Sequence, residues 1–191
     1  MTTLTADKTN DTTNANFDKT NSDTVSDKSA LLPPTEGYPW HSLPLDPERL
    51  SRYLGTCLAH GVGYELGAKA HDLLAIPPDY RAIDCSGWVR AAVAVATEGK
   101  VILPDGSAGQ NDWCAAHDLK RSDFAACRLA DGLTRIAFIR ANGFHPIGHV
   151  YLARNGRTLE SFGGHGPGSR PVTTHVLSAE TTDVYVLAVR M

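Results

Sequence analysis

A cysteine stands at the edge of a nearly all-apolar stretch: Cys85 comes just before the run Trp88 to Ala96, which only Arg90 interrupts. Such a run predicts a buried helix, with Cys85 in its first turn and Asp84 as N-cap. The helix dipole and free backbone N–H groups draw a thiol at this position toward the thiolate. The same N–H groups, with the neighbouring Ser86, can receive an oxyanion. Taken alone, however, Cys85 is more simply explained as a small buried hydrophobe.

A histidine that could act as a base lies on a predicted hairpin. Asn155-Gly156 is a strong two-residue turn signal, so segments 149–154 and 157–162 are expected to pair as antiparallel strands. Counting outward from the turn places Glu160 diagonally opposite His149, with both side chains on one face. A carboxylate in that place orients the imidazole, which takes up and releases protons near neutral pH.

These three side chains form the set of nucleophile, base and orienter that hydrolytic triads share. Singly, His149 and Glu160 are better explained as ordinary strand residues, but their joint placement favours a function. His165, in the segment Gly163-Gly164-His165-Gly166 that we expect to be a flexible loop, is the alternative to Glu160. Glu160 is favoured because a strand positions a side chain better than a loop does.

Tyr64 is a further candidate, on the loop that leads toward the cysteine. Its hydroxyl could lie near Cys85 and contact a substrate, since loops carry function on rigid scaffolds. It could equally be an ordinary packed tyrosine. The sequence leaves these two explanations open.

The elements that must position these residues follow from local patterns. Asp46-Pro47 predicts a helix start and Gly61 its end, and the buried helix should end near Glu98-Gly99. No clear pattern covers 107–131. Strands are expected at 134–140, 149–154, 157–162 and 183–190. Helices first and strands later predict an α+β fold, with helices packed on one face of an antiparallel sheet.

Length and composition predict one folded domain. A chain of 191 residues with 42% hydrophobic content can bury a core without disulfides. Residues 1–30, rich in Thr, Asn, Asp, Lys and Ser, should form a disordered polar tail. Residues 31–45 form an extended proline-rich lead-in, and 46–191 a single domain that would carry the catalysis.

Several classes of protein are disfavoured. A net charge of −3 gives no reason to expect nucleic acid as a partner. The four cysteines are irregularly spaced, so a disulfide framework is not expected and the protein should be made in the reducing cytoplasm. No apolar run is long enough to span a membrane, and no secretory signal is evident. Cys114-x-x-His117, followed by Cys127, has zinc-ligand spacing but lacks a second pair, so we expect no metal and no cofactor.

The block Asp84-Cys85-Ser86-Gly87-Trp88-Val89, followed by Gly148-His149-Val150, resembles the NlpC-type cell-wall peptidases, a family of papain-like cysteine hydrolases. Tyr64-Glu65-Leu66-Gly67 and Ser107-Ala108-x-Gln110 are similar to further segments of that family. The likeness covers about Tyr64 to Phe162. The third catalytic residue of the family is often His, whereas the matching position here is Glu160.

The resemblance implies a papain-like fold and metal-free hydrolysis of an amide in peptidoglycan stem peptides, typically the γ-D-glutamyl-diaminopimelate bond. An acyltransferase of the same fold and an inactive binding module are the alternatives. Without a signal or wall-binding repeat, we expect delivery by a type VI secretion machine, as a monomeric antibacterial toxin that acts in the target periplasm. An immunity protein would then cover the Cys85 cleft. A cell-wall peptidase of a phage particle is the other context.

Overall fold

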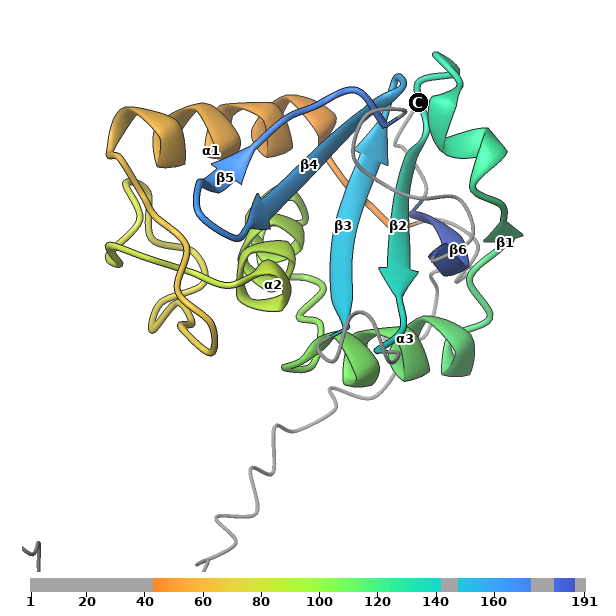
Figure 1. Cartoon of the computed structure of the whole chain (residues 1–191), viewed down its shortest axis with the longest axis horizontal. Coiled ribbons are helices and arrows are strands. Elements are labelled where there is room, and N and C mark those ends of the chain that lie inside the picture. The colour runs from red at the N-terminus through yellow and green to blue at the C-terminus, as the bar shows by residue number, and fades with distance from the viewer. Residues whose placement is uncertain (1–42, 142–147, 173–180, 188–191) are drawn as a thin grey trace, which may run out of the picture. The chain divides into compact units, whose positions relative to one another are not determined.

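The computed structural model describes residues 43–141, 148–172 and 181–187. The predicted polar tail, 1–30, and residues 31–42 of the predicted lead-in lie outside the described residues, so the domain boundaries stay predictions. The elements, shown in Figure 1, are α1 (Pro47–Ala59), α2 (Cys85–Ala96), α3 (Ser107–Ala116), β1 (Arg121–Ser122), the 3-10 helix η1 (Ala125–Arg128), β2 (Thr134–Ile139), β3 (His149–Arg154), β4 (Arg157–Phe162), β5 (Gly166–Gly168) and β6 (Thr181–Leu187).

The strands form one antiparallel sheet in the order β1-β6-β2-β3-β4-β5. Side chains alternate between its two faces. On one face, sheet residues such as Ile136 and Leu152 join the main core with apolar side chains from α1, α2 and α3. On the other face, Tyr151 and Ala137 pack with Cys127 of η1 in a smaller cluster. The three α-helices therefore cover one face, and the predicted α+β class is confirmed.

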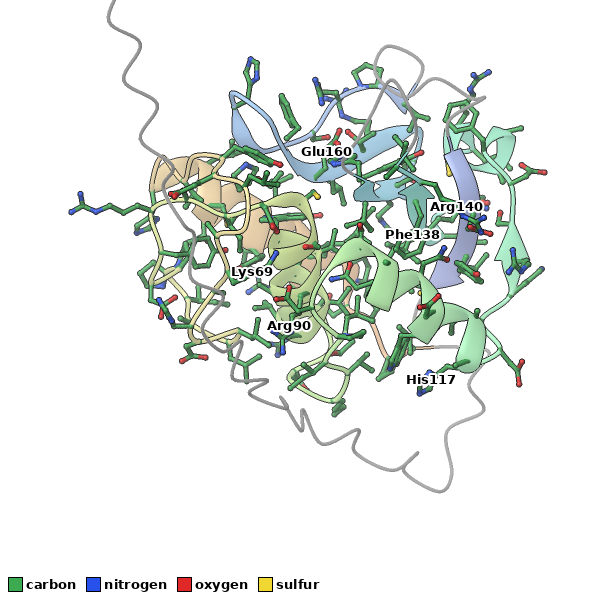
Figure 2. The ribbon with its side chains drawn as sticks, turned by 60° about the horizontal axis from the view of Figure 1, so that its bottom comes forward. Lys69, Arg90, His117, Phe138, Arg140 and Glu160 are labelled. Atoms are coloured by element: carbon green, nitrogen blue, oxygen red, sulfur yellow. The ribbon has the colours of Figure 1, made fainter. Side chains whose placement is uncertain are left out.

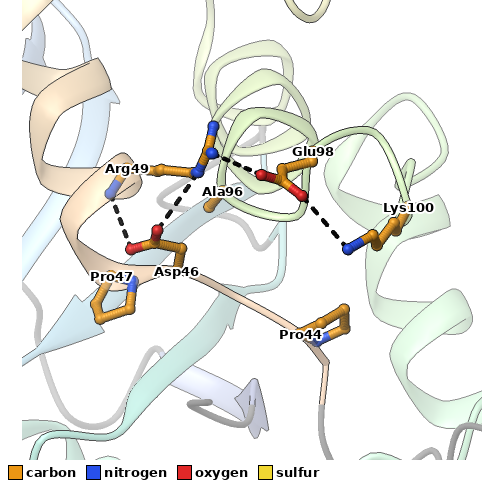
Figure 3. A pocket seen from close by; sticks show the side chains of 7 residues that line it. All are labelled: Pro44, Asp46, Pro47, Arg49, Ala96, Glu98 and Lys100. Carbon is orange, nitrogen blue, oxygen red and sulfur yellow. Dashed lines mark hydrogen bonds and ion pairs between the residues drawn. The ribbon is translucent and has the colours of Figure 1, made fainter. Parts of the chain in front are cut away.

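The first helix begins where the cap and proline predict. The Asp46 carboxylate accepts the backbone N–H of Glu48 at 2.8 Å, and Pro47 opens α1. Figure 3 shows how this end is tied to the end of α2, because Arg49 pairs with Asp46 at 3.4 Å and with Glu98 at 2.5 Å. These partly exposed pairs each contribute about 1 kcal/mol or less. The Asp46 N–H also donates to the carbonyl oxygen of Ala96 at 2.8 Å.

The second helix is buried over almost its whole length, as its apolar sequence predicts. Asp84 is its N-cap and accepts the N–H of Gly87 at 2.7 Å. The helix ends at Thr97, whose hydroxyl donates to the carbonyl of Val93 at 2.8 Å. Cys85 is thus fixed at the first position of a rigid helix that packs against β3 and β4.

The hairpin forms around Asn155 and Gly156, which have φ angles of 49° and 73°. Both values suit the type I′ turn that this pair favours. Arg154 pairs with Arg157, and the register extends to Leu152 and Leu159. The position of Glu160 was deduced by counting outward from this turn. The predicted register is confirmed from Arg154–Arg157 to Leu152–Leu159.

Two local predictions need correction, and one segment without a prediction forms regular elements. The segment 107–131, which shows no clear pattern, contains α3, β1 and η1. The last strand begins at Thr181 rather than 183, and its predicted end, 188–190, lies outside the described residues. Gly166 is not in a loop but begins β5, which pairs with Phe162 of β4. Glycine residues carry no apolar pattern, so pairing with a neighbouring strand decided this element.

Candidate active site

The side chains of Cys85 and His149 lie close enough to interact, since the Cys85 thiol is among the groups that raise the pKa of His149. Cys85 is the first residue of α2 and His149 the first residue of β3. The Nε2 atom of His149 lies 2.6 Å from Glu160 Oε2, which leaves Nδ1 as the ring nitrogen for the thiol. The structure therefore aligns thiol, imidazole and carboxylate in that order.

The imidazole of His149 is held between the Cys85 thiol and the Glu160 carboxylate. Its side chain is 23% exposed, and the ring of Tyr151 stacks beside it with centroids 6.2 Å apart. Burial alone lowers the pKa of His149. The hydrogen bonds and charges of Cys85 and Glu160 outweigh burial and raise this pKa to about 9. The imidazolium form is thus favoured at neutral pH.

Glu160 is a fully buried carboxylate, with 0% of its side chain exposed. Its Oε2 faces His149, and its Oε1 lies 3.3 Å from the guanidinium of Arg170. Burial raises the pKa of Glu160. Hydrogen bonds from His149 and Thr158, with the positive charges of His149 and Arg170, outweigh burial and hold this pKa below its usual range. Two cations therefore keep a buried carboxylate ionised.

A second network fixes the start of α2 around Asp84. Its carboxylate forms an ion pair with Lys69 and accepts the N–H of Gly67 at 3.1 Å. Lys69 also donates to the hydroxyl of Ser86 at 2.9 Å. Figure 2 shows Lys69 beside α2. Asp84 thereby joins the preceding loop to the turn that carries Cys85.

The two predicted substrate-side residues have different surroundings. Tyr64 is half-buried, and burial is the largest cause that raises its pKa. Its proximity to Cys85 and Asp84 raises this pKa further. Ser86 is buried, and its hydroxyl donates to Asp84 at 3.1 Å. The side chain of Ser86 is therefore occupied within the fold, so its contribution to an oxyanion site would come from the backbone.

Two hydrogen bonds tie distant elements to the nucleophile's turn. Ser161 of β4 donates to the carbonyl oxygen of Ile83 at 2.7 Å. The fully buried Gln110 of α3 donates to the carbonyl of Ser86 at 2.8 Å. The sheet and α3 thus both hold the segment that contains Cys85.

The alternative site residues lie elsewhere. His165 is exposed, its ring lies 4.8 Å from that of Phe162, and Glu160 occupies the Nε2 side of His149. His117 stacks on Trp113 at 4.0 Å, while Cys114 is buried in the core. Within the described ranges, no group of three or more His, Cys, Asp or Glu residues is placed to hold a metal ion.

Sequence reasoning missed Arg170 and Lys69. Arg170 follows Gly166-Pro167-Gly168, where no pattern indicates that β5 will turn back along β4 and bring the guanidinium to Glu160. Lys69 was visible only as one residue of a loop before the cysteine. A buried acidic cap such as Asp84 requires a cation, and this requirement was the signal that could have indicated Lys69.

A cavity of about 290 Å³ adjoins the start of β3. Gly148, directly before His149, lies in its wall. Figure 2 shows Phe138 and Arg140, which also line it, near α3. The full lining is Ser107, Ala108, Asn111, Asp112, Phe138, Ile139, Arg140, Ala141 and Gly148. The cavity thus has apolar walls and both an acidic and a basic side chain, Asp112 and Arg140, and it lies beside β3, the strand that carries His149.

No protein-family model matches the chain, and no curated protein matches it. Among solved structures, it is similar to an NLP/P60-family protein, described as similar to lipoprotein, from Staphylococcus aureus subsp. aureus Mu50. The TM-score is 0.48 and the sequence identity is 15%, over 78% of this chain and 44% of that one. The chain therefore spans less than half the length of that protein. Within the part of the chain that the structure describes, no helix has the length and apolarity to cross a membrane.

Proposed function

We propose that the protein is a cysteine hydrolase that cleaves an amide bond. The observation that carries this proposal is the contact of Cys85 with an imidazole whose other nitrogen is bonded to a buried, ionised Glu160. A packing role for Cys85 requires neither neighbour. Nucleophilic catalysis requires both of them.

In the proposed reaction, His149 already holds the thiol proton as the imidazolium, and the sulfur of Cys85 attacks the amide carbonyl carbon. The C–N bond then breaks, and His149 gives its proton to the leaving amine. A water molecule, deprotonated by His149, hydrolyses the resulting thioester, and the thiol is restored. Glu160 keeps the ring in place and stabilises its charged form.

The start of α2 supplies the proposed oxyanion site. First-turn N–H groups of a helix have no partner within the helix. Asp84 caps Gly87, so the N–H groups of Cys85 and Ser86 are the ones positioned for a developing oxyanion. Because their helix is buried and tied down by Gln110, these donors need little reorganisation during the reaction.

Peptidoglycan stem peptides are the substrate class that we propose, with the γ-D-glutamyl-diaminopimelate amide as the bond. The cysteine block and the Gly148-His149-Val150 segment support this class through their resemblance to NlpC-type peptidases. The cavity beside Gly148 supports it through Arg140, whose guanidinium pairs with Asp183 at 2.9 Å but is largely exposed, so that it can also meet a substrate carboxylate. Delivery as a toxin, and an immunity partner, stay predictions.

Digestion of purified peptidoglycan, followed by mass spectrometry of the fragments, tests the proposal. Wild type should release fragments cut at one amide, and Cys85→Ala should release none. Glu160→Gln should retain a reduced rate, since the third residue orients and does not attack. Cys127→Ala, which removes a buried thiol from the smaller core cluster, is the control and should stay active.

Two results would contradict the proposal. Equal digestion by wild type and Cys85→Ala would exclude thiol catalysis. A wild-type product that carries a transferred acyl group, in place of a free carboxylate, would indicate acyltransferase chemistry by the same residues.

A further inference from the structure

Arg170 has surroundings that surface packing alone does not explain. Its guanidinium lies 3.3 Å from Glu160 Oε1, on the side of the carboxylate away from His149. Its Cζ atom lies 3.3 Å from the ring centroid of Phe162, so the aromatic face supports the planar group. The side chain is 26% exposed, in contact with a carboxylate that is fully buried.

The backbone around Arg170 is fixed as well. Thr158 donates its N–H to the carbonyl oxygen of Arg170 at 2.7 Å, and the N–H of Arg170 lies 3.3 Å from the Thr158 hydroxyl. The Thr158 side chain also helps to lower the pKa of Glu160, on the same strand. Arg170 therefore approaches Glu160 from a segment that is bonded to the strand carrying Glu160.

We propose that Arg170 is a positioning residue of the reaction: it holds Glu160 in place and shares its negative charge, so that His149 is oriented without retaining its proton too strongly. This inference rests on the proposed function for its catalytic meaning. The effect of the Arg170 charge on Glu160 and His149 can be measured whether or not the protein is an enzyme.

The sign of the effect follows from the charges around the imidazole. The titratable groups that act on His149 are Cys85 from α2 and Glu160 from β4, with the Tyr151 ring beside it on β3. Without Arg170, the whole charge of Glu160 would act on the imidazolium, which would become a weaker acid. It would then give its proton to a leaving amine less readily.

The test measures the pKa of His149 by NMR titration in Arg170→Met, Arg170→Lys and wild type. Arg170→Met should raise this pKa by roughly one unit and lower kcat on stem peptides roughly three- to tenfold. Arg170→Lys keeps the charge and should restore most of both values. Arg157→Met is the matched control, because the Arg157 side chain bonds Ser169, at 3.0 and 2.9 Å, and does not contact Glu160 within the described residues.

Two outcomes would overturn the inference. If the pKa of His149 is unchanged or falls in Arg170→Met, Arg170 has only a structural role, because a loosened site would lose the raising effect of Glu160. A shift that Arg170→Lys does not restore would also exclude charge sharing. The titration needs no turnover, so failure of the proposed function would appear separately, as inactivity of the wild type with the predicted pKa shift intact.

Discussion

At the scale of single residues, the four cysteines have different environments. All four are free and buried. Burial is the largest cause that raises the pKa of Cys57, and it raises that of Cys114 to about 12 and that of Cys127 to about 11. Cys85, in contrast, lies beside the imidazole of His149 and helps to raise its pKa. Position at a helix start, rather than residue type, thus distinguishes the proposed nucleophile.

We expect iodoacetamide to alkylate Cys85 first. At neutral pH, thiols with a pKa near 11 or 12 are almost wholly protonated and react at least roughly a hundredfold more slowly than an activated thiol. Peptide mapping by mass spectrometry after brief labelling of the native protein measures this selectivity. Labelling in denaturant is the control and should modify all four cysteines. Equal labelling of Cys85 and Cys114 in the native protein would contradict the prediction.

At the scale of elements, the close approach of β5 to the loop before α2 shapes the site. Gly166 begins β5 with a φ of 82°, and a Cβ atom there would lie 2.3 Å from the carbonyl oxygen of Val62. Val62 lies two residues before Tyr64. The strand after Glu160 and the loop that carries Tyr64 are thus in backbone contact, which only glycine permits.

Gly166→Ala should therefore destabilise the fold by more than about 3 kcal/mol, through backbone strain and a backbone clash that side-chain movement cannot relieve. Gly164→Ala is the matched control, since Gly164 has a φ of 80° but open space around its Cα. It should cost only about 1 kcal/mol. Urea denaturation followed by circular dichroism measures both. Similar losses for the two variants would show that the close approach is unimportant.

At the scale of the molecule, Asp183 of β6 joins three elements on the side of the sheet next to the cavity. Its carboxylate accepts from Asn111 of α3 at 3.1 Å, and from Arg121 of β1 and Arg140 after β2 at 2.9 Å each. Burial raises the pKa of Asp183. The three donors outweigh burial, so the pKa lies below its ordinary 3.8.

The sign of the pH dependence follows from that lowered pKa. The carboxylate of Asp183 contributes stability above pH 3.8, and this contribution is lost as the pH falls through the lower folded value. Asp183→Asn should lower the free energy of unfolding by about 1 to 2 kcal/mol at pH 7, because both arginines are largely exposed and screened. The difference should shrink below pH 3.8 in urea titrations. Asp112→Asn, an exposed change on α3, is the control, and a pH-independent difference would contradict the assignment.

Much of the site follows from patterns that are local in the sequence. The cap Asp84, the apolar run after Cys85 and the Asn155-Gly156 turn each act over a few residues, so the helix start and the hairpin register could be predicted. Strand alternation then placed Glu160 near His149, and the contact is present at 2.6 Å. The fold class followed from the order of helices and strands.

Tertiary structure decided what local patterns do not contain. The contact of Cys85 with His149 depends on α2 packing against β3, and the guanidinium at Glu160 depends on β5 turning back along β4. Neither Lys69 nor Arg170 belongs to a periodic element, so no local pattern indicated which cation would pair with each carboxylate. The cost of burying the carboxylates Asp84 and Glu160 is offset by cations that only the folded chain brings within reach. The sequence alone therefore determined α1, α2, the β3–β4 hairpin and the faces of its side chains, whereas folding determined α3, β1, η1, β5 and the partners of each buried charge.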